Sequence, residues 1–153
     1  IFIQGIVYDG LNSYIIKSKT ITIHGKIRGL YCPDNKLVSL DVSKAKSLKS
    51  IDCSRNRLTE LDVSKCKKLH RLYCYFNTIK QEAMTTLINS LPKYKGKDKG
   101  ELVIQCLDTE EPHLQEGNEY LPESIKKAKA KNWRVWCRNY AGERKWQQKK
   151  TEL

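Results

Sequence analysis

The 153-residue sequence lacks the features that mark several large classes of protein. It contains no run of about 18 apolar residues, so no segment is long and apolar enough to span a membrane as a helix. It has no Gly-rich phosphate-binding loop, no Gly-x-Ser-x-Gly and no His-Glu-x-x-His, and its histidines, His24, His70 and His113, stand far apart. These absences favour a non-enzymatic protein with no cofactor and no metal site.

A signal peptide is also missing from the start of the sequence. Residues 1–6 carry neither an initiating Met nor a charged region ahead of an apolar stretch. The missing Met suggests a mature or trimmed chain, and an export signal could have been removed from it.

What the sequence does contain is a 21-residue repeat. The block Leu-Tyr-Cys-Pro-Asp-Asn-Lys-Leu at 30–37 returns in related form at 51–58 and again at 72–79. Between these blocks, Leu-Asp-Val-Ser-Lys occurs at 40–44 and 61–65. A fixed period of this length predicts stacked units, each too small to bury its own apolar face and each covered by its neighbour.

The pattern Leu-x-x-Leu-x-Cys-x-x-Asn-x-Leu stands at 48–58 and 69–79, and in degenerate form at 27–37. It resembles the leucine-rich repeat, and more narrowly the 21-residue repeats found in surface proteins of gut and oral anaerobic bacteria. The resemblance implies an α/β solenoid of about three repeats, with one short parallel strand per repeat along a concave face and tight turns on the convex side. It also implies an exported or cell-surface protein.

The repeat spacing predicts two internal columns of side chains. Neighbouring strands lie about 4.8 Å apart, so residues separated by one repeat superpose. Cysteine is small and readily buried, which suits a narrow core. An asparagine where the chain leaves a strand can bond backbone groups that the turn leaves unpaired. The predicted columns are Cys32, Cys53 and Cys74, and Asn35, Asn56 and Asn77.

We expect free thiols, although six cysteines are present. In-register neighbours keep their Cβ atoms near 5 Å, whereas a disulfide needs about 3.8 Å. Three thiols in a row are also too spread out to surround one Zn²⁺. Cys66 lies in a predicted convex turn and is expected to be the most exposed thiol, while Cys106 and Cys137 are expected to be able to face each other.

We predict one structural domain with three parts: an N-terminal β cap over 1–26, repeats over 27–80 and an α/β C-terminal cap over 81–153. Strands are expected at 2–8, 14–17 and 20–24, with a turn at Asp9-Gly10. These would cover the edge and the apolar end of the first repeat.

In the C-terminal cap, apolar residues at Met84, Leu87, Ile88 and Leu91 predict a helix that ends at Pro92. A strand at 102–107, a helix at 121–131 and a strand at 133–137 follow, and the two strands should be parallel. One of Trp133 and Trp136 should be core and the other semi-exposed, and the tail should fray beyond Trp146. The residues 89–92 and 128–133 also resemble the closing segment of the bacterial repeat family.

Net charge is +12, and residues 27–80 carry +7 of it, from 12 basic and 5 acidic side chains. A basic surface speeds encounters with anionic partners such as nucleic acid, acidic glycan or acidic protein. The alternative is that the charge serves only solubility.

The leading interpretation is a monomeric, non-enzymatic binding module that contacts a protein or glycan through the concave face. Tyr and Arg dominate the energetics of many interfaces, and outward strand positions carry no core packing. Three alternatives stay open: electrostatic binding of nucleic acid or another acidic polymer, a purely structural or adhesive repeat, and aromatic neighbours that merely stiffen the sheet. The predicted outward positions include Tyr31, Asp52, Ser54, Arg71, Tyr73 and Tyr75, with Lys49, Arg55 and Phe76 flanking them.

Overall fold

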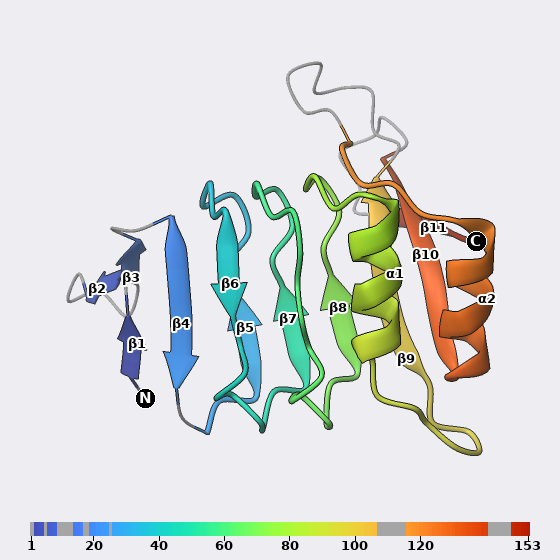
Figure 1. The fold of residues 1–153 in the computed structure, drawn as a ribbon, viewed down its shortest axis with the longest axis horizontal. Coiled ribbons are helices and arrows are strands. Elements are labelled where there is room, and N and C mark those ends of the chain that lie inside the picture. The colour runs from blue at the N-terminus through green and yellow to red at the C-terminus, as the bar shows by residue number, and fades with distance from the viewer. Residues whose placement is uncertain are drawn as a thin grey trace.

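The computed structural model describes residues 2–4, 6–8, 14–16, 19–24, 26–106, 116–140 and 148–153. Within these ranges the chain has a mixed α/β fold with three sheets and two helices (Figure 1). The α/β class predicted from the sequence is therefore confirmed.

The largest sheet has six strands in the order β11-β10-β9-β8-β7-β5. Each repeat contributes one short strand, and these strands pair in parallel at a spacing of 21 residues, as in Gly29 opposite Ser50 and Ser50 opposite Arg71. Only β11 runs antiparallel to its neighbour in this sheet. The strands are β5 (Gly29–Tyr31), β7 (Ser50–Asp52), β8 (Arg71–Tyr73), β9 (Gly100–Cys106), β10 (Trp133–Tyr140) and β11 (Gln148–Glu152).

The N-terminal part forms two smaller sheets. One has the order β1-β4-β6, in which β4 pairs antiparallel with β1 and parallel with β6; the other is the antiparallel pair β2-β3. The single strand predicted over 2–8 is two strands, and the predicted turn at Asp9-Gly10 lies outside the described residues. The strands are β1 (Phe2–Gln4), β2 (Ile6–Tyr8), β3 (Tyr14–Ile16), β4 (Thr20–His24) and β6 (Ser39–Asp41).

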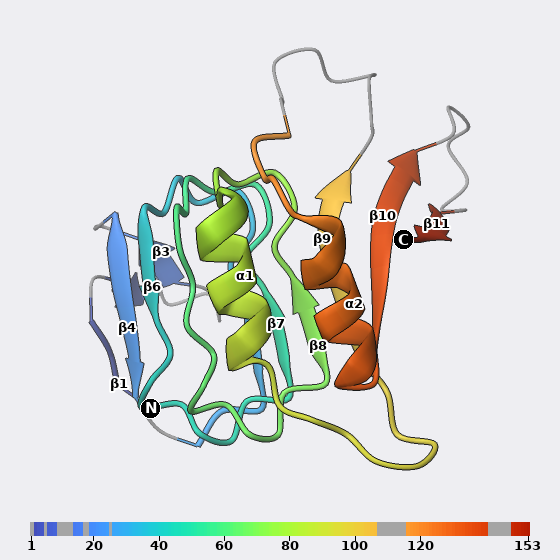
Figure 2. The ribbon, with the colours of Figure 1, turned by 45° about the vertical axis from the view of Figure 1, so that its right-hand side comes forward.

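Two helices, α1 (Gln81–Ser90) and α2 (Pro122–Ala130), cover the same face of the six-stranded sheet (Figure 2). Both helices were predicted from their apolar spacing, and the predicted parallel pairing of the strands around α2 is confirmed by β9 and β10. Their ten and nine residues are too few to cross a membrane, and no other helix occurs in the described ranges.

The covered face carries one apolar row across five strands. Met84 and Leu87 of α1 and Ile125 of α2 belong to the same core cluster as this row. The row therefore joins the repeats to the C-terminal segment in one core. Its members are Leu30, Ile51, Leu72, Leu102 and Val135, each opposite the next.

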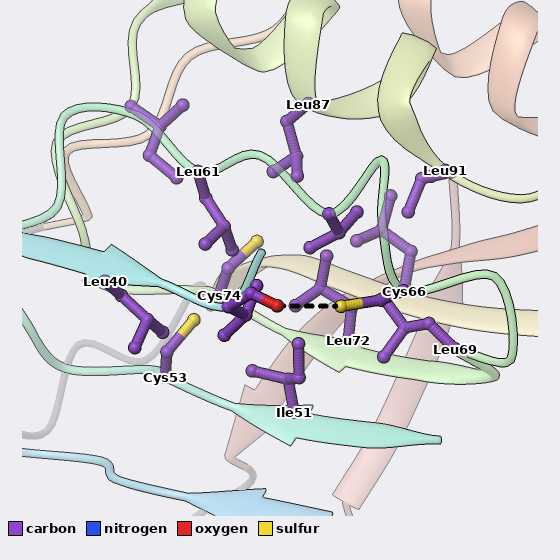
Figure 3. Packing of buried hydrophobic residues seen from close by; sticks show 14 of the residues in the cluster. Leu40, Ile51, Cys53, Leu61, Cys66, Leu69, Leu72, Cys74, Leu87 and Leu91 are labelled. Carbon is purple, nitrogen blue, oxygen red and sulfur yellow. Dashed lines mark hydrogen bonds between the residues drawn. The ribbon is translucent and has the colours of Figure 1, made fainter. Parts of the chain in front are cut away.

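Cys66 belongs to this core, contrary to the exposed position predicted for it. The side chain is fully buried (Figure 3). Its Sγ donates toward the carbonyls of Val42 and Ala45 at 3.7 and 3.9 Å. Ala45, one repeat earlier, is buried in the same way, and both residues follow the same turn, with their N–H groups donating to Val42 O and Val63 O. The same turn therefore directs a small side chain into the core in both repeats.

The C-terminal tail also differs from the prediction that it frays beyond Trp146. Residues 148–152 form β11, whose pairing with β10 places Glu152 opposite Trp136. Leu153 packs against the core and its N–H donates to Val135 O at 3.0 Å. A charged sequence forms a strand here because β10 offers it an unpaired edge.

All six cysteines are free and buried, as predicted for the thiol state. The expectation that Cys106 and Cys137 can face each other is wrong. A bulge between Trp136 and Cys137 shifts the register, so Cys137 lies opposite Gln105 and Arg138 lies opposite Cys106.

Candidate binding surface

The face of the six-stranded sheet opposite the helices, called here the open face, carries the predicted contact residues. Strand pairing arranges its side chains in rows, because every other residue of each strand points to this face. The first row is Tyr31, Asp52, Tyr73, Val103 and Trp136, and the second is Gly29, Ser50, Arg71, Glu101 and Arg134.

The part of the open face on β5, β7 and β8 is polar and accessible. Tyr31 is 80% exposed, and among the described residues only Val38 is another exposed large hydrophobic side chain. Arg71 is exposed and Asp52 is half-buried. Lys49, one residue before β7, is also exposed, but it has the strand parity of Ile51, which faces the helices. Three of the predicted contact residues, Tyr31, Asp52 and Arg71, therefore lie on neighbouring strands of one surface and are accessible.

Tyr73 lies at the centre of the first row and is held in place. Its hydroxyl donates to Glu101 Oε1 at 2.8 Å. Burial of the ring, followed by the bond to this carboxylate, raises the pKa of Tyr73 to about 12. The hydroxyl stays protonated at neutral pH, and the half-exposed ring is a preorganised aromatic contact.

Tyr75 is not part of the accessible surface, which corrects its predicted role. It is only 4% exposed, with its ring 5.7 Å from that of Phe76. Arg138 of β10 lies over the Tyr75 ring at 5.1 Å and donates to its hydroxyl. The sequence pattern missed this burial because Arg138 comes from a strand 63 residues away.

Three further predicted contact positions, Ser54, Arg55 and Phe76, are also more enclosed than predicted. Phe76 is 5% exposed and Ser54 is 1% exposed. Arg55 is half-buried, with its guanidinium 5.7 Å from the centre of the Phe76 ring. These residues fill the turns beyond the strand ends, where the chain doubles back over its own backbone.

An apolar cluster occupies the C-terminal half of the open face. Tyr75, Phe76, Val103 and Cys106 form it, with Trp136 packed at its margin. Trp133 is core and Trp136 is half-buried, so the predicted division between the two tryptophans is confirmed. Trp136, Glu101 and Arg134 were not predicted as part of the surface, although strand alternation around Trp133 pointed to Trp136.

Glu116 joins this cluster to the repeats. Its carboxylate accepts N–H bonds from Phe76, Cys106 and Asn118, at distances of 2.9 to 3.1 Å. Burial raises the pKa of Glu116, and these three N–H donors, together with the N–H of Gly117, oppose that rise. The carboxylate thereby fixes the turn that follows β8 and keeps Tyr75 and Phe76 inward.

An asparagine ladder, formed by Asn56, Asn77 and Asn118, lies behind the ends of the strands. Asn56 accepts from Leu37 N and donates to Cys32 O, both at 2.9 Å, while Asn77 accepts from Leu58 N at 2.9 Å. Asn77 and Asn118 also donate across to carbonyls of neighbouring strands. These bonds confirm the predicted role of Asn56 and Asn77.

The ladder differs from the prediction at both ends. Asn35 is half-exposed, and its amide nitrogen donates to Pro33 O of its own turn, at 2.7 Å. In the described chain no strand pairs with the outer edge of β5. The Asn35 amide therefore has no carbonyl of a further strand to bond. Asn118 was not predicted, since it stands 41 residues after Asn77 and outside the repeat.

The cysteine column is confirmed as internal. Cys32, Cys53 and Cys74 are at most 4% exposed, and the sulfurs of Cys53 and Cys74 donate to carbonyls of the next strand. Burial raises the pKa of all three thiols, to about 12 for Cys32. Among the described residues no group of three His, Cys, Asp or Glu side chains could hold a metal ion.

A cavity of about 350 Å³ lies on the helix side, away from the open face. Leu40 of β6, Leu61 and Ala83 of α1 line it, together with the carboxylates of Asp41 and Asp62. It contains none of the residues predicted to bind a partner.

No protein-family model matches the sequence, and comparison with curated proteins and with solved structures finds no match. The assignment of a function therefore depends on the chemistry of the surface itself.

Proposed function

We propose that the chain is a leucine-rich repeat solenoid of about three repeats with a cap at each end, and that it is a non-enzymatic binding module. Its open face is the concave face of that solenoid and binds a protein or a glycan outside the cell. The observation that supports this function most is the row of side chains that contains Tyr31 and Tyr73. Tyr31 is 80% exposed, and Tyr73 is held in place by its bond to Glu101.

The contact residues follow from accessibility and rigidity. Tyr31 and Arg71 are exposed, and Tyr73 and Trp136 are partly exposed in the same row as Tyr31, Trp136 at its far end on β10. Tyrosine, tryptophan and arginine contribute large contact areas at low entropic cost, which is why they dominate many interfaces. Asp52 and Glu101 alternate with Arg71 across the strands, so the surface favours a partner with complementary polar groups over a uniformly charged polymer.

The experiment compares the captured partners of two double variants. Tyr31→Ser with Arg71→Ser removes two exposed open-face side chains, while Lys46→Ser with Lys67→Ser removes two exposed lysines from turns between the strands. Each open-face change should cost about 1–2 kcal/mol of binding, or roughly fivefold to thirtyfold in affinity. Chemical crosslinking with mass spectrometry identifies protein partners, and a glycan array tests sugars.

The open-face variant should lose the partner while the lysine variant keeps it. Equal recovery by both variants would contradict the proposal. A partner whose affinity falls log-linearly and steeply with salt, and which the lysine variant alone loses, would instead support the electrostatic alternative.

A further inference from the structure

The strand β5 ends the six-stranded sheet with an unpaired edge. Its inner side pairs with β7, and no described strand pairs with its outer side. The N-terminal strand β4 pairs with β6, which belongs to a different sheet (Figure 1). The described N-terminal strands thus cover the edge of β6 and leave that of β5 uncovered.

The backbone groups on this outer edge can be identified from the pairing with β7. Ser50 N donates to Arg28 O at 3.2 Å, and Cys32 N donates to Asp52 O at 2.8 Å. Peptide groups alternate in direction along a strand, so those of Gly29 and Tyr31 point away from β7. In the described part of the chain, no hydrogen bond involves these outward groups.

The residues of this edge are accessible. Gly29 is exposed, and a Cβ added there, which would point to the open face, would meet no atom within 4 Å. The side chain of Tyr31 is the most exposed large apolar group that the structure describes. An unpaired, accessible strand edge is a template for an added strand.

Charge indicates which strand would fit. Lys26, Arg28 and Lys49 are exposed around the N-terminal end of β5, and Lys49 N donates to Arg28 O at 2.7 Å. Beyond the other end, Asp34 and Lys36 offset each other. In an antiparallel pair of two copies of this chain, Asp34 and Lys36 would face these cations and offer no net negative charge, whereas an acidic segment would complement them.

We propose that the outer edge of β5 binds an extended acidic segment of a partner protein by strand addition. The segment bonds the peptide groups of Gly29 and Tyr31 and places its carboxylates against Lys26, Arg28 and Lys49. This site goes beyond the proposed function, because it recognises backbone and charge at the sheet edge and does not need the side chains of the open face.

The decisive pair of variants is Gly29→Pro and Gly29→Ala. Proline removes the outward N–H of residue 29 and breaks no internal hydrogen bond, because that N–H does not face β7. Alanine keeps the N–H and fits the open space. Urea unfolding of each variant, compared with wild type, verifies that both are folded.

The probes are two fluorescent octapeptides, one alternating glutamate with valine and one alternating lysine with valine, measured by fluorescence anisotropy at low salt. The glutamate peptide should bind wild type and Gly29→Ala with similar affinity and bind Gly29→Pro about fivefold or more weakly. It should also slow hydrogen exchange at the amides of Gly29 and Tyr31, and the lysine peptide should do neither.

A second variant keeps the test valid if Gly29→Pro fails to fold. Arg28→Glu with Lys49→Glu leaves the backbone intact and should reverse the preference between the two peptides.

Equal binding by the proline and alanine variants, unchanged exchange at Gly29 and Tyr31, or an unreversed preference would each overturn the proposal. So would a wild-type dimer that Gly29→Pro abolishes. Arg71→Ser should bind the glutamate peptide normally, so failure here is distinguishable from failure of the open-face proposal.

Discussion

Replacing Asn56 by Ala tests whether the asparagine ladder stabilises the fold. The Asn56 side chain makes five hydrogen bonds in a site that is 8% exposed. It accepts from Asn35 N and Leu37 N at 3.1 and 2.9 Å, and it donates to the carbonyls of Cys32, Cys53 and Ser54 at 2.9 to 3.1 Å. Alanine removes all of these bonds and leaves the buried Leu37 N–H without a partner.

The expected loss is about 2–4 kcal/mol of unfolding free energy. One net bond contributes about 1 kcal/mol, which sets an upper value near 5 kcal/mol for five bonds. The real loss is smaller, because an amide has two hydrogens for its three acceptors and because water can enter from the half-exposed Asn35 side. For a domain of this size the melting temperature should fall by roughly 6–12 °C.

Asn35→Ala is the matched control, since it removes the same side chain from the same position of the preceding repeat. Asn35 donates its amide only within its own turn and is half-exposed, so its loss should cost less than about 1 kcal/mol. Urea unfolding followed by circular dichroism gives both values with comparable slopes. Midpoints that coincide for the two variants would refute the argument that the ladder satisfies buried backbone groups.

Three further predictions concern the core. In the folded protein at pH 8, a thiol reagent should label none of the six cysteines until urea is added, because all six are buried. Burial also raises the pKa of Cys66 to about 11, so its thiol is protonated at pH 8. Rapid labelling of Cys66 would contradict its inward position. The pKa of these thiols is about 9.0 in the unfolded chain and higher in the folded protein. Unfolding free energy should therefore fall as pH rises above 9.0, because the unfolded chain releases thiol protons there and the folded protein does not. Gly100→Ala should lower the unfolding free energy measured in urea by about 1–3 kcal/mol, because the new Cβ would lie 2.2 Å from Trp133 Cδ2. Gly29→Ala is the control and should be nearly neutral. Similar urea midpoints for the two variants would show that the indole of Trp133 moves aside at little cost.

Much of the architecture follows from periodicity in the sequence. The 21-residue spacing set the pairing of β5, β7 and β8 and the burial of Cys53 and Cys74, because equal spacing superposes equal positions in neighbouring strands. The apolar spacing that begins at Met84 located α1 for a similar reason, since one face of a helix must be buried.

The candidate surface was predictable only on the three repeated strands, β5, β7 and β8. Tyr31, Asp52, Arg71 and Tyr73 lie where strand alternation placed them. Tyr75 does not, because Arg138 from outside the repeat packs over its ring. The same rows also contain Trp136, Glu101 and Arg134. The strand pairings that place them there do not follow the 21-residue repeat, so the sequence pattern did not predict them.

The sequence by itself determined the order and register of the repeated strands, because each unit is encoded by its own local pattern of apolar residues. The tertiary structure decided what happens where that pattern stops. Asn118 is the last member of the ladder, the charged tail pairs with β10 as β11, and no described strand pairs with the outer edge of β5. These features depend on which unpaired edge or buried backbone group a distant segment can reach, and such contacts arise only after the chain has folded.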